Sequence, residues 1–269
     1  MNALFAVPPF FRFSTRLVFA AVAFIILALV GSPLHAQVLN VESYRAEADT
    51  AGSWSGSLQF GFAASKQKSE TIQLNSRSST SYFGERDSYL FITNINFLRI
   101  DDELISNGYI HLRSTLFYNN RWSPEAFTQY QYSQDWGLRR RNLLGAGVRY
   151  NFFDSDDFTA GFTTGAMYES EVWRSEDGPR QAFDRIKSTN SLLMRGNLSS
   201  NTTLYVVGYY QAEPADFFNP RLTGDVQLRF RISRIVQFSA QFSTTYDYAP
   251  AIDIQSWIYS FRNSIVISL

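Results

Sequence analysis

Hydrophobic and polar residues alternate one by one through the last part of the chain. From residue 222 onward, the odd positions are polar and the even positions are Leu222, Gly224, Val226, Leu228, Phe230 and Ile232. The alternation resumes from Val236 to Tyr246 and again from Trp257 to Leu269. Side chains of a β-strand point to opposite faces in turn, so these segments predict strands with one apolar and one polar face.

The same pattern, in weaker form, continues upstream and predicts an all-β chain of about twelve strands. The predicted strands cover residues 54–65, 70–76, 88–99, 108–118, 124–133, 142–152, 157–169, 184–195, 202–212, 221–233, 235–248 and 256–269. Most have about the 9–11 residues that a tilted strand needs to cross a bilayer. An even number suits an up-and-down antiparallel barrel that starts and ends on the same side, with ten or fourteen strands as alternatives.

Connection lengths support this arrangement, because outer-membrane barrels have short periplasmic turns and longer external loops. With the C-terminus in the periplasm, the periplasmic turns are the short connections at 233–234, 197–201 and 153–157. The external loops are then the longer connections at 249–255, 213–220 and 170–183. The connection at 77–87 departs from the pattern, because it is long and lies on the periplasmic side.

The N-terminus carries a different signal. Arg12 and Arg16 precede an apolar run over residues 17–30, and Ala36 is a small residue before a potential cleavage site. This pattern predicts a cleaved signal peptide at 1–36 and a polar lead-in at 37–53 before the barrel at 54–269. An uncleaved membrane anchor is the alternative. No later stretch approaches the roughly 20 apolar residues of a spanning helix.

A soluble sandwich also has alternating strands, but three features favour a transmembrane barrel in the outer membrane of a Gram-negative bacterium. Aromatic residues gather near strand ends, as amphipathic girdles at the headgroups require: Tyr150, Phe152, Tyr246, Tyr248, Trp257 and Tyr259. The polar faces carry many charges opposite nearly continuous apolar faces. The final strand looks like the signal that brings outer-membrane barrels to their assembly machinery, through Phe261, Ile265, Ile267 and Leu269. Expected partners are therefore this machinery, outer-membrane lipid and lipopolysaccharide, in an oligomeric state that the sequence leaves open. A secreted, ligand-binding β-sandwich is the alternative.

Composition excludes several functions. The chain has 24 basic and 24 acidic residues and therefore no formal net charge, which argues against nucleic-acid binding. It has no cysteine, and so no disulfide framework or thiolate metal site. His111 is the only histidine after the signal peptide, and the serine nearest to it, Ser114, projects from the opposite face of the strand. The sequence thus predicts no catalytic, cofactor or metal site, although a lipid-modifying barrel enzyme is a further alternative.

Charged residues suggest two possible sites. If polar positions face inward, the lumen carries the basic residues His111, Arg113, Arg149, Arg185, Lys187, Arg195, Arg229, Arg231 and Arg262, and fewer acids such as Glu169 and Asp225. Such a lumen predicts passage of anions or anionic oligosaccharides. The competing interpretation, which small barrels favour, is an interior filled by its own side chains. A second basic cluster, Arg139, Arg140 and Arg141, is predicted in an external loop, where it would meet lipopolysaccharide phosphates or solvent.

One stretch resembles a known family. The aromatic run from Trp122 to Trp136 is followed by arginines 139–141 and then by Leu144-Gly145-x-Gly147-x-x-Tyr150. This stretch resembles the salt-induced outer membrane proteins, which form domain-of-unknown-function family 481, and the likeness extends from about residue 54 to residue 269. The resemblance implies an outer-membrane barrel and a connection with salt, and it implies little about chemistry. With the features above, we expect a barrel without enzyme activity, in envelope maintenance or small-solute passage under osmotic change. It carries no functional residues over to this chain.

Overall fold

The protein was analysed as a computed structural model that describes residues 52–66, 70–174, 179–250 and 255–268. The expected signal peptide at 1–36, all but the last two residues of the lead-in at 37–53, and Leu269 lie outside these residues. Over the described ranges, no helix is long and apolar enough to cross a membrane.

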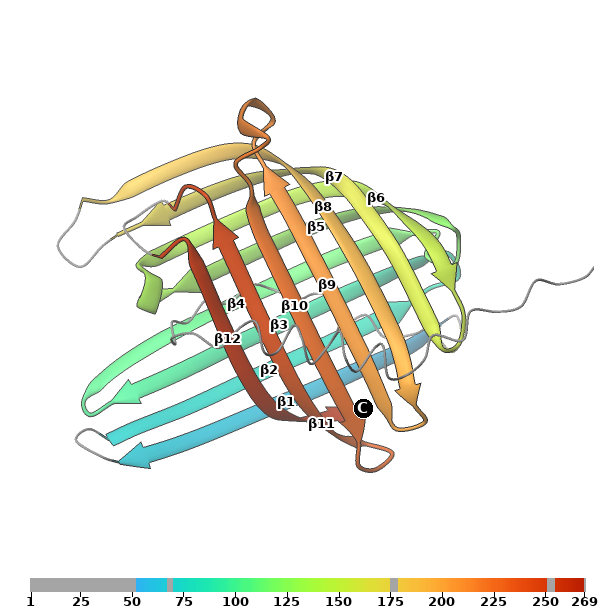
Figure 1. The fold of residues 1–269 in the computed structure, drawn as a ribbon, viewed down its shortest axis with the longest axis horizontal. Helices are drawn as coiled ribbons and strands as arrows, with labels where there is room; N and C mark the ends of the chain where they lie inside the picture. The colour runs from blue at the N-terminus through green and yellow to red at the C-terminus, as the bar shows by residue number, and fades with distance from the viewer. Residues whose placement is uncertain (1–51, 67–69, 175–178, 251–254, 269) are drawn as a thin grey trace, which may run out of the picture. The chain divides into compact units, whose positions relative to one another are not determined.

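The chain forms a closed barrel of twelve antiparallel strands, which confirms the predicted fold (Figure 1). Each strand pairs with the next in sequence, and β12 returns to β1. The strands are β1 (Ser53–Lys66), β2 (Glu70–Phe83), β3 (Asp87–Ile100), β4 (Glu103–Leu116), β5 (Trp122–Ser133), β6 (Leu138–Asp154), β7 (Phe158–Trp173), β8 (Gln181–Ser199), β9 (Thr202–Ala212), β10 (Arg221–Arg231), β11 (Val236–Asp247) and β12 (Trp257–Ser268). Within the part of the chain that the structure describes, the 3-10 turns η2 (Gln134–Trp136) and η3 (Pro214–Asp216) lie in connections.

The two ends of the barrel differ in their connections. One end, called the turn end here, has the connections 84–86, 117–121, 155–157, 200–201 and 232–235, and β12 finishes there. The other end, called the loop end, has the connections 101–102, 134–137, 174–180, 213–220 and 248–256. The longest connections join the last strands at the loop end, as the sequence predicts for external loops.

Several predicted boundaries were wrong, and three of them change the connections or a candidate site. The long connection at 77–87 does not exist, because β2 continues to Phe83 in register with β1 and leaves a turn of only three residues. The loop at 170–183 is shorter, since β7 runs to Trp173 and β8 begins at Gln181. The arginines 139–141, predicted in a loop, belong to the first residues of β6.

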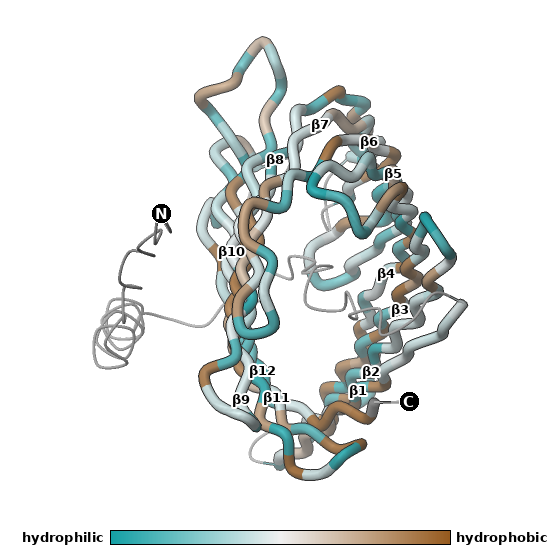
Figure 2. The backbone as a smooth tube through the Cα atoms, turned by 90° about the vertical axis from the view of Figure 1, so that its right-hand side faces the viewer, coloured by the Kyte–Doolittle hydropathy of each residue, from teal (hydrophilic) through white to brown (hydrophobic). Residues whose placement is uncertain are grey.

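Side chains separate by polarity across the wall. Inward positions are polar and buried, with Gln227 fully buried and Glu169 only 1% exposed, whereas outward residues such as Leu144 and Ile186 are 63% and 65% exposed. The alternation of hydrophobic and hydrophilic positions is visible along β1 to β4 in Figure 2. An apolar outside and a polar inside are the reverse of a soluble protein and typical of a transmembrane barrel.

Exposed aromatic residues lie at both ends of the outer surface. At the turn end, the ring centroids of Trp122 and Tyr150 are 4.4 Å apart, and those of Phe153 and Phe158 are 5.8 Å apart. At the loop end, the Trp257 Nε1 donates to Thr244 Oγ1 at 2.7 Å while its ring stays exposed. Two aromatic girdles separated by an apolar band are the outer surface expected of a barrel in a bilayer.

Candidate functional site in the barrel lumen

The register of the strands places the predicted lumen residues on the inward face. His111, Arg113, Arg149 and Lys187 are buried, and Arg185, Arg195, Arg229 and Arg262 are half-buried. Arg231 is exposed at the last position of β10. The structure brings four of these cations, Arg113, Arg149, Arg185 and Lys187, into two clusters, one toward each end of the barrel.

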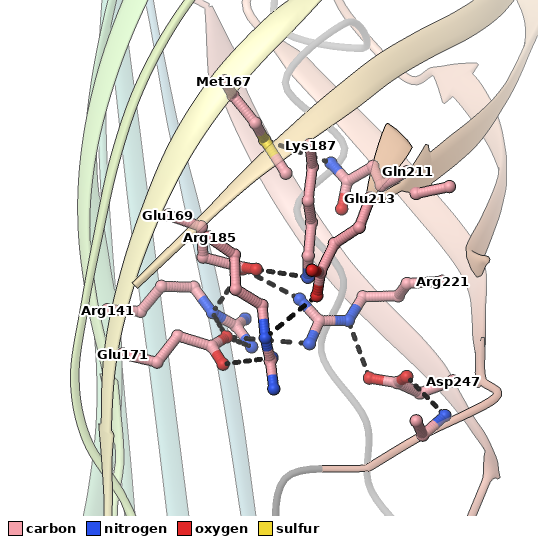
Figure 3. A network of polar contacts seen from close by, with 12 residues as sticks. Arg141, Met167, Glu169, Glu171, Arg185, Lys187, Gln211, Glu213, Arg221 and Asp247 are labelled. Carbon is pink, nitrogen blue, oxygen red and sulfur yellow. Dashed lines mark hydrogen bonds and ion pairs between the residues drawn. The ribbon is translucent and has the colours of Figure 1, made fainter. Parts of the chain in front are cut away.

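The larger cluster, called the loop-end network here, joins five strands and one loop (Figure 3). Its members are Arg141 of β6, Glu169 and Glu171 of β7, Arg185 and Lys187 of β8, Glu213 of the loop between β9 and β10, Arg221 of β10 and Asp247 of β11. Glu169 and Glu171 lie two residues apart on one strand, so both carboxylates point into the lumen. They form the centre of the network.

Each central carboxylate contacts several cations. The Glu169 carboxylate lies 3.3 Å from Arg141 Nε and 2.9 Å from Arg221 Nη1, and it also pairs with Lys187 Nζ. Glu171 accepts from Arg141 at 2.5 Å and from the indole of Trp173 at 3.0 Å. With several donors each, these two carboxylates recover much of the solvation that burial removes.

Arg221 links the centre to the opposite strands. Besides its contact with Glu169, its Nε donates to Asp247 Oδ2 at 2.8 Å. Arg185 extends the network in another direction, because its Nε lies 3.1 Å from Glu213 Oε1. The cationic and anionic groups of the loop-end network are equal in number, so its charges are balanced.

The second cluster, called the turn-end group here, consists of Arg113, Glu125 and Arg149. The Glu125 carboxylate lies 3.3 Å from Arg113 Nη1 and 3.0 Å from Arg149 Nε. All three side chains are less than a tenth exposed. Two arginines share one carboxylate, so this group has a net positive charge.

A cavity of about 140 Å³ lies between the two clusters. Arg113 and Glu125 line it on one side, and Arg141, Glu169 and Arg221 line it on the other. Gly147 and Gly165 form part of its wall; a Cβ on Gly147 would lie 2.6 Å from the carbonyl oxygen of Thr164, so this close approach of β6 and β7 requires glycine. Its lining includes three arginines, Arg113, Arg141 and Arg221, and three carboxylates, Glu125, Glu169 and Asp247, so cationic groups face the cavity from two directions with acids beside them.

His111 lies beside this cavity but resembles a structural residue. Its Nδ1 is 3.0 Å from Gln129 Oε1, and its ring stacks on Phe127 with centroids 5.8 Å apart. Neither neighbour is a nucleophile, and among the described residues that line the cavity the one serine is Ser191, which belongs to another strand, β8. Over the described ranges, no group of three or more His, Asp or Glu residues is placed to hold a metal ion.

Several residues of the lumen were not predicted from the sequence. The carboxylates Glu125, Glu171 and Asp247 and the cation Arg221 all face inward. Glu171 was missed because the strand was expected to end at residue 169; its spacing of two from Glu169 would have signalled a shared face. Of the three arginines predicted to form an external cluster, Arg139 and Arg140 are exposed, but Arg141 points into the lumen. They do not form a single patch.

Solved structures similar to this chain are outer-membrane barrels. The COG4313 outer membrane channel from Pseudomonas putida F1 has 8% identity and a TM-score of 0.50, and the match covers 86% of this chain and 99% of that chain. The NanC porin has 8% identity and a TM-score of 0.47, covering 80% and 97%. The translocator domain of the autotransporter NalP from Neisseria meningitidis has 10% identity and a TM-score of 0.41, covering 94% and 96%. At these identities the likeness concerns the fold alone.

No curated protein is similar enough in sequence to count as a relative. A family model does match, over residues 58–256, which is most of the barrel. Its description, a protein of unknown function, assigns no chemistry to the lumen. The chain therefore belongs to the family described as protein of unknown function, DUF481.

Proposed function

We propose that this protein is a non-enzymatic barrel of the outer membrane that passes small anionic solutes through its lumen. The observation that carries the proposal is the cavity of about 140 Å³ that has cations of both clusters in its wall. Rings of arginine and lysine favour anions in pores, because they replace part of the hydration that the anion loses. The likeness of the fold to outer-membrane channels agrees with this role.

The charge of the inner wall supports an anion preference. Its acidic residues within the described strands include Glu125, Glu169, Glu171, Asp225 and Asp247. Its basic residues are more numerous: Arg77, Arg113, Arg141, Arg149, Arg185, Lys187, Arg195, Arg221, Arg229, Arg231 and Arg262. A positive wall in a narrow space of low dielectric concentrates anions and repels cations.

A second role, support of the envelope by a filled barrel, is favoured by the burial of the inner wall. Gln227 and Ser239 are fully buried, and Gln227 Nε2 donates to Ser239 Oγ at 2.7 Å. In this role the barrel would contact outer-membrane lipid and lipopolysaccharide, reach the membrane through its C-terminal strand, and act under osmotic change. Small barrels are often filled by their own side chains.

Conductance of the refolded protein in a planar bilayer separates the two roles. Solute passage predicts current steps and, across a KCl gradient, a reversal potential that indicates anion preference. Arg113→Gln should lower the anion-to-cation permeability ratio, because Arg113 lines the cavity. Arg139→Gln is the matched control, since it removes the same charge from an exposed position and should leave the ratio unchanged.

Three outcomes would contradict the proposal. Absence of current steps in any salt favours the filled barrel. Cation preference rejects the role of the arginines. Hydrolysis of lipid by the purified protein would show an enzyme. Membrane fractionation and heat-modifiable gel mobility test the location and the closed barrel independently of transport.

A further inference from the structure

A groove of about 480 Å³ lies on the outer surface of the wall that runs from β7 to β12 (Figure 1). Its floor contains Gly208 of β9 and Gly224 of β10, which are directly opposite each other in the sheet. The side chains around this floor are mainly large and apolar or aromatic: Phe162, Leu192, Tyr210, Leu222, Tyr246 and Trp257. The groove therefore opens on the face that hydrocarbon covers when the barrel spans a bilayer.

The barrel itself does not require the glycine floor. Glycine weakens the interior of a strand, and there it commonly marks a bulge or the close approach of another molecule. The described residues of β9, β10 and β11 pair without a register shift, so these glycines do not mark a bulge. A Cβ on Gly208 would lie 3.9 Å from the carbonyl oxygen of Thr223, which is an ordinary contact. The open space above Gly208 therefore indicates room for another molecule.

Hydrogen bonds within the protein fix the rim of the groove. Tyr210 Oη donates to the carbonyl oxygen of Phe217, and the two rings pack with their centroids 5.1 Å apart. At the other end of the groove, Trp257 Nε1 donates to Thr244 Oγ1 at 2.7 Å. A rim that is fixed in this way loses less conformational entropy when a molecule binds, so the groove is preorganised.

Asn190 supplies a polar group in this apolar groove. Its Oδ1 accepts from Thr164 Oγ1 at 2.8 Å, so its Nδ2 is left as a donor. The strand register places Asn190 in one row of the sheet with Tyr210 and Trp257. Tyrosine and tryptophan lie at the headgroup level of a bilayer, and Gly208 is farther from the loop end than Tyr210 on the same strand. The groove thus begins where lipid carbonyl groups lie and continues into hydrocarbon.

The groove lies at the external end of the barrel. Tyr210, Tyr246 and Trp257 are near the loop end of their strands, and the longer connections of the loop end are external. The loop between β9 and β10 adds apolar surface there, because Phe218 is 91% exposed beside Phe217. The lipid of this outer leaflet is mainly lipopolysaccharide, whose acyl chains are joined to sugars through ester and amide carbonyl groups.

We propose that this groove binds one acyl chain of lipopolysaccharide. The chain lies on Gly208 and Gly224, and its linking carbonyl accepts a hydrogen bond from Asn190 Nδ2. Recognition depends on the shape of the groove and on this hydrogen bond, and it needs no charged group. A second copy of the protein is a less favourable occupant, because the convex wall of another barrel does not fit a floor that lies between larger side chains. This inference goes beyond solute passage and does not depend on it.

Two measurements test the proposal. First, the protein is extracted from outer membranes in a mild detergent, and the lipid that remains bound is identified by mass spectrometry. Lipopolysaccharide should remain bound in preference to phospholipid. Second, the refolded protein is titrated in detergent with purified lipid A, the acylated part of lipopolysaccharide, to obtain a dissociation constant. Heat-modifiable gel mobility confirms that each variant is folded.

Two variants change the groove in different ways. Gly208→Leu places a side chain on the floor and should raise the dissociation constant of lipid A about tenfold, because the chain then loses its closest contacts. Asn190→Leu removes the amide donor and should raise the dissociation constant about fivefold, the effect of one hydrogen bond. Ala166→Leu is the matched control, since Ala166 is also small and exposed on the outer face but lies outside the groove. It should leave the dissociation constant unchanged.

Each contrary result overturns the proposal. Unchanged affinity of Asn190→Leu and of folded Gly208→Leu for lipid A would show that the chain binds elsewhere. Phospholipid that is retained in place of lipopolysaccharide, and is lost in Gly208→Leu, would assign the groove to a different lipid. Dimers that Gly208→Leu dissociates would assign it to a second copy of the protein. Conductance is measured without lipid A, so solute passage and lipid binding can fail independently.

Discussion

The two halves of the barrel wall are stabilised in different ways. One half, the charged wall, comprises β4 to β10 and contains the turn-end group and most of the loop-end network. The other half, the seam wall, comprises β11, β12 and β1 to β3, and its inward residues are mainly serine, asparagine and glutamine. Buried ion pairs stabilise the first half. Neutral hydrogen bonds stabilise the second half, where the described residues of β1 and β12 pair only from Ser57–Phe60 to Ile265–Ser268. The difference implies that substitutions of single polar residues should cost more stability in the charged wall than in the seam wall.

The largest expected effect is in the charged wall, at Glu169. Glu169→Gln removes the charge that balances Arg141, Lys187 and Arg221 and leaves them close together in a buried site. Breaking a buried ion pair from one side costs about 3–5 kcal/mol of unfolding free energy. Urea titration of the refolded barrel, followed by gel mobility, measures this loss.

Glu103→Gln is the control for Glu169→Gln, because Glu103 is exposed at the loop end. Its effect should stay within about 0.5 kcal/mol, as is usual for surface substitutions. If Glu169→Gln lost less than about 1 kcal/mol, the ion pairs would not be what distinguishes the charged wall.

A smaller effect is expected at the turn end. Glu125→Gln should cost about 2 kcal/mol, because it weakens the charged hydrogen bonds to Arg113 and Arg149 and leaves both arginines beside a neutral amide. If the lumen conducts, the same substitution should raise the anion-to-cation permeability ratio, since the cavity gains a net positive charge. A loss of stability larger than that of Glu169→Gln would reverse the ranking of the two clusters.

The contrast between the walls was only partly predictable from the sequence. Alternation with period two was enough to place Arg113, Arg149 and Lys187 in the lumen, because strand geometry leaves two faces only. The alternation fails at residues 77–83, where serine and threonine occupy both faces. Pairing with β1 keeps that segment extended despite its weak strand propensity.

Contacts between strands that are far apart along the chain could not be predicted from the sequence. Arg141 and Arg221 are 80 residues apart along the chain, and no periodicity shows that both reach Glu169. Three consecutive arginines indicate a solvated loop by composition, yet only Arg139 and Arg140 are solvated. The partner of Arg141 depends on the register of β6 against β7. The alternation of polar and apolar residues predicts which face a residue occupies, but it does not predict which residues of the two strands lie opposite each other.

Within the seam wall, single substitutions should have modest effects. Ser57 Oγ and Ser79 Oγ lie 2.7 Å apart on neighbouring strands, and both hydroxyls are neutral. Ser79→Ala should cost about 1 kcal/mol, the usual net value of one hydrogen bond. The same urea titration measures it, with Ser79→Thr as a control that keeps the hydroxyl. A loss comparable to that of Glu169→Gln would mean that the seam wall is as strongly held as the charged wall.

The smallest effect concerns an ion pair on the outer face of the seam wall. Arg99 Nη2 and Glu70 Oε1 are 3.0 Å apart at the loop end, with side chains 49% and 42% exposed. Arg99→Gln should cost at most about 1 kcal/mol at low salt, because water screens exposed pairs. At 1 M NaCl the screening length falls to about 3 Å, so this cost should nearly vanish. The cost of Glu169→Gln should persist at 1 M NaCl, because its cations are buried with it and salt screens buried pairs much less. Equal salt sensitivity of the two substitutions would show that ions reach the loop-end network freely, and the charged wall would then be a hydrated surface and not a buried support.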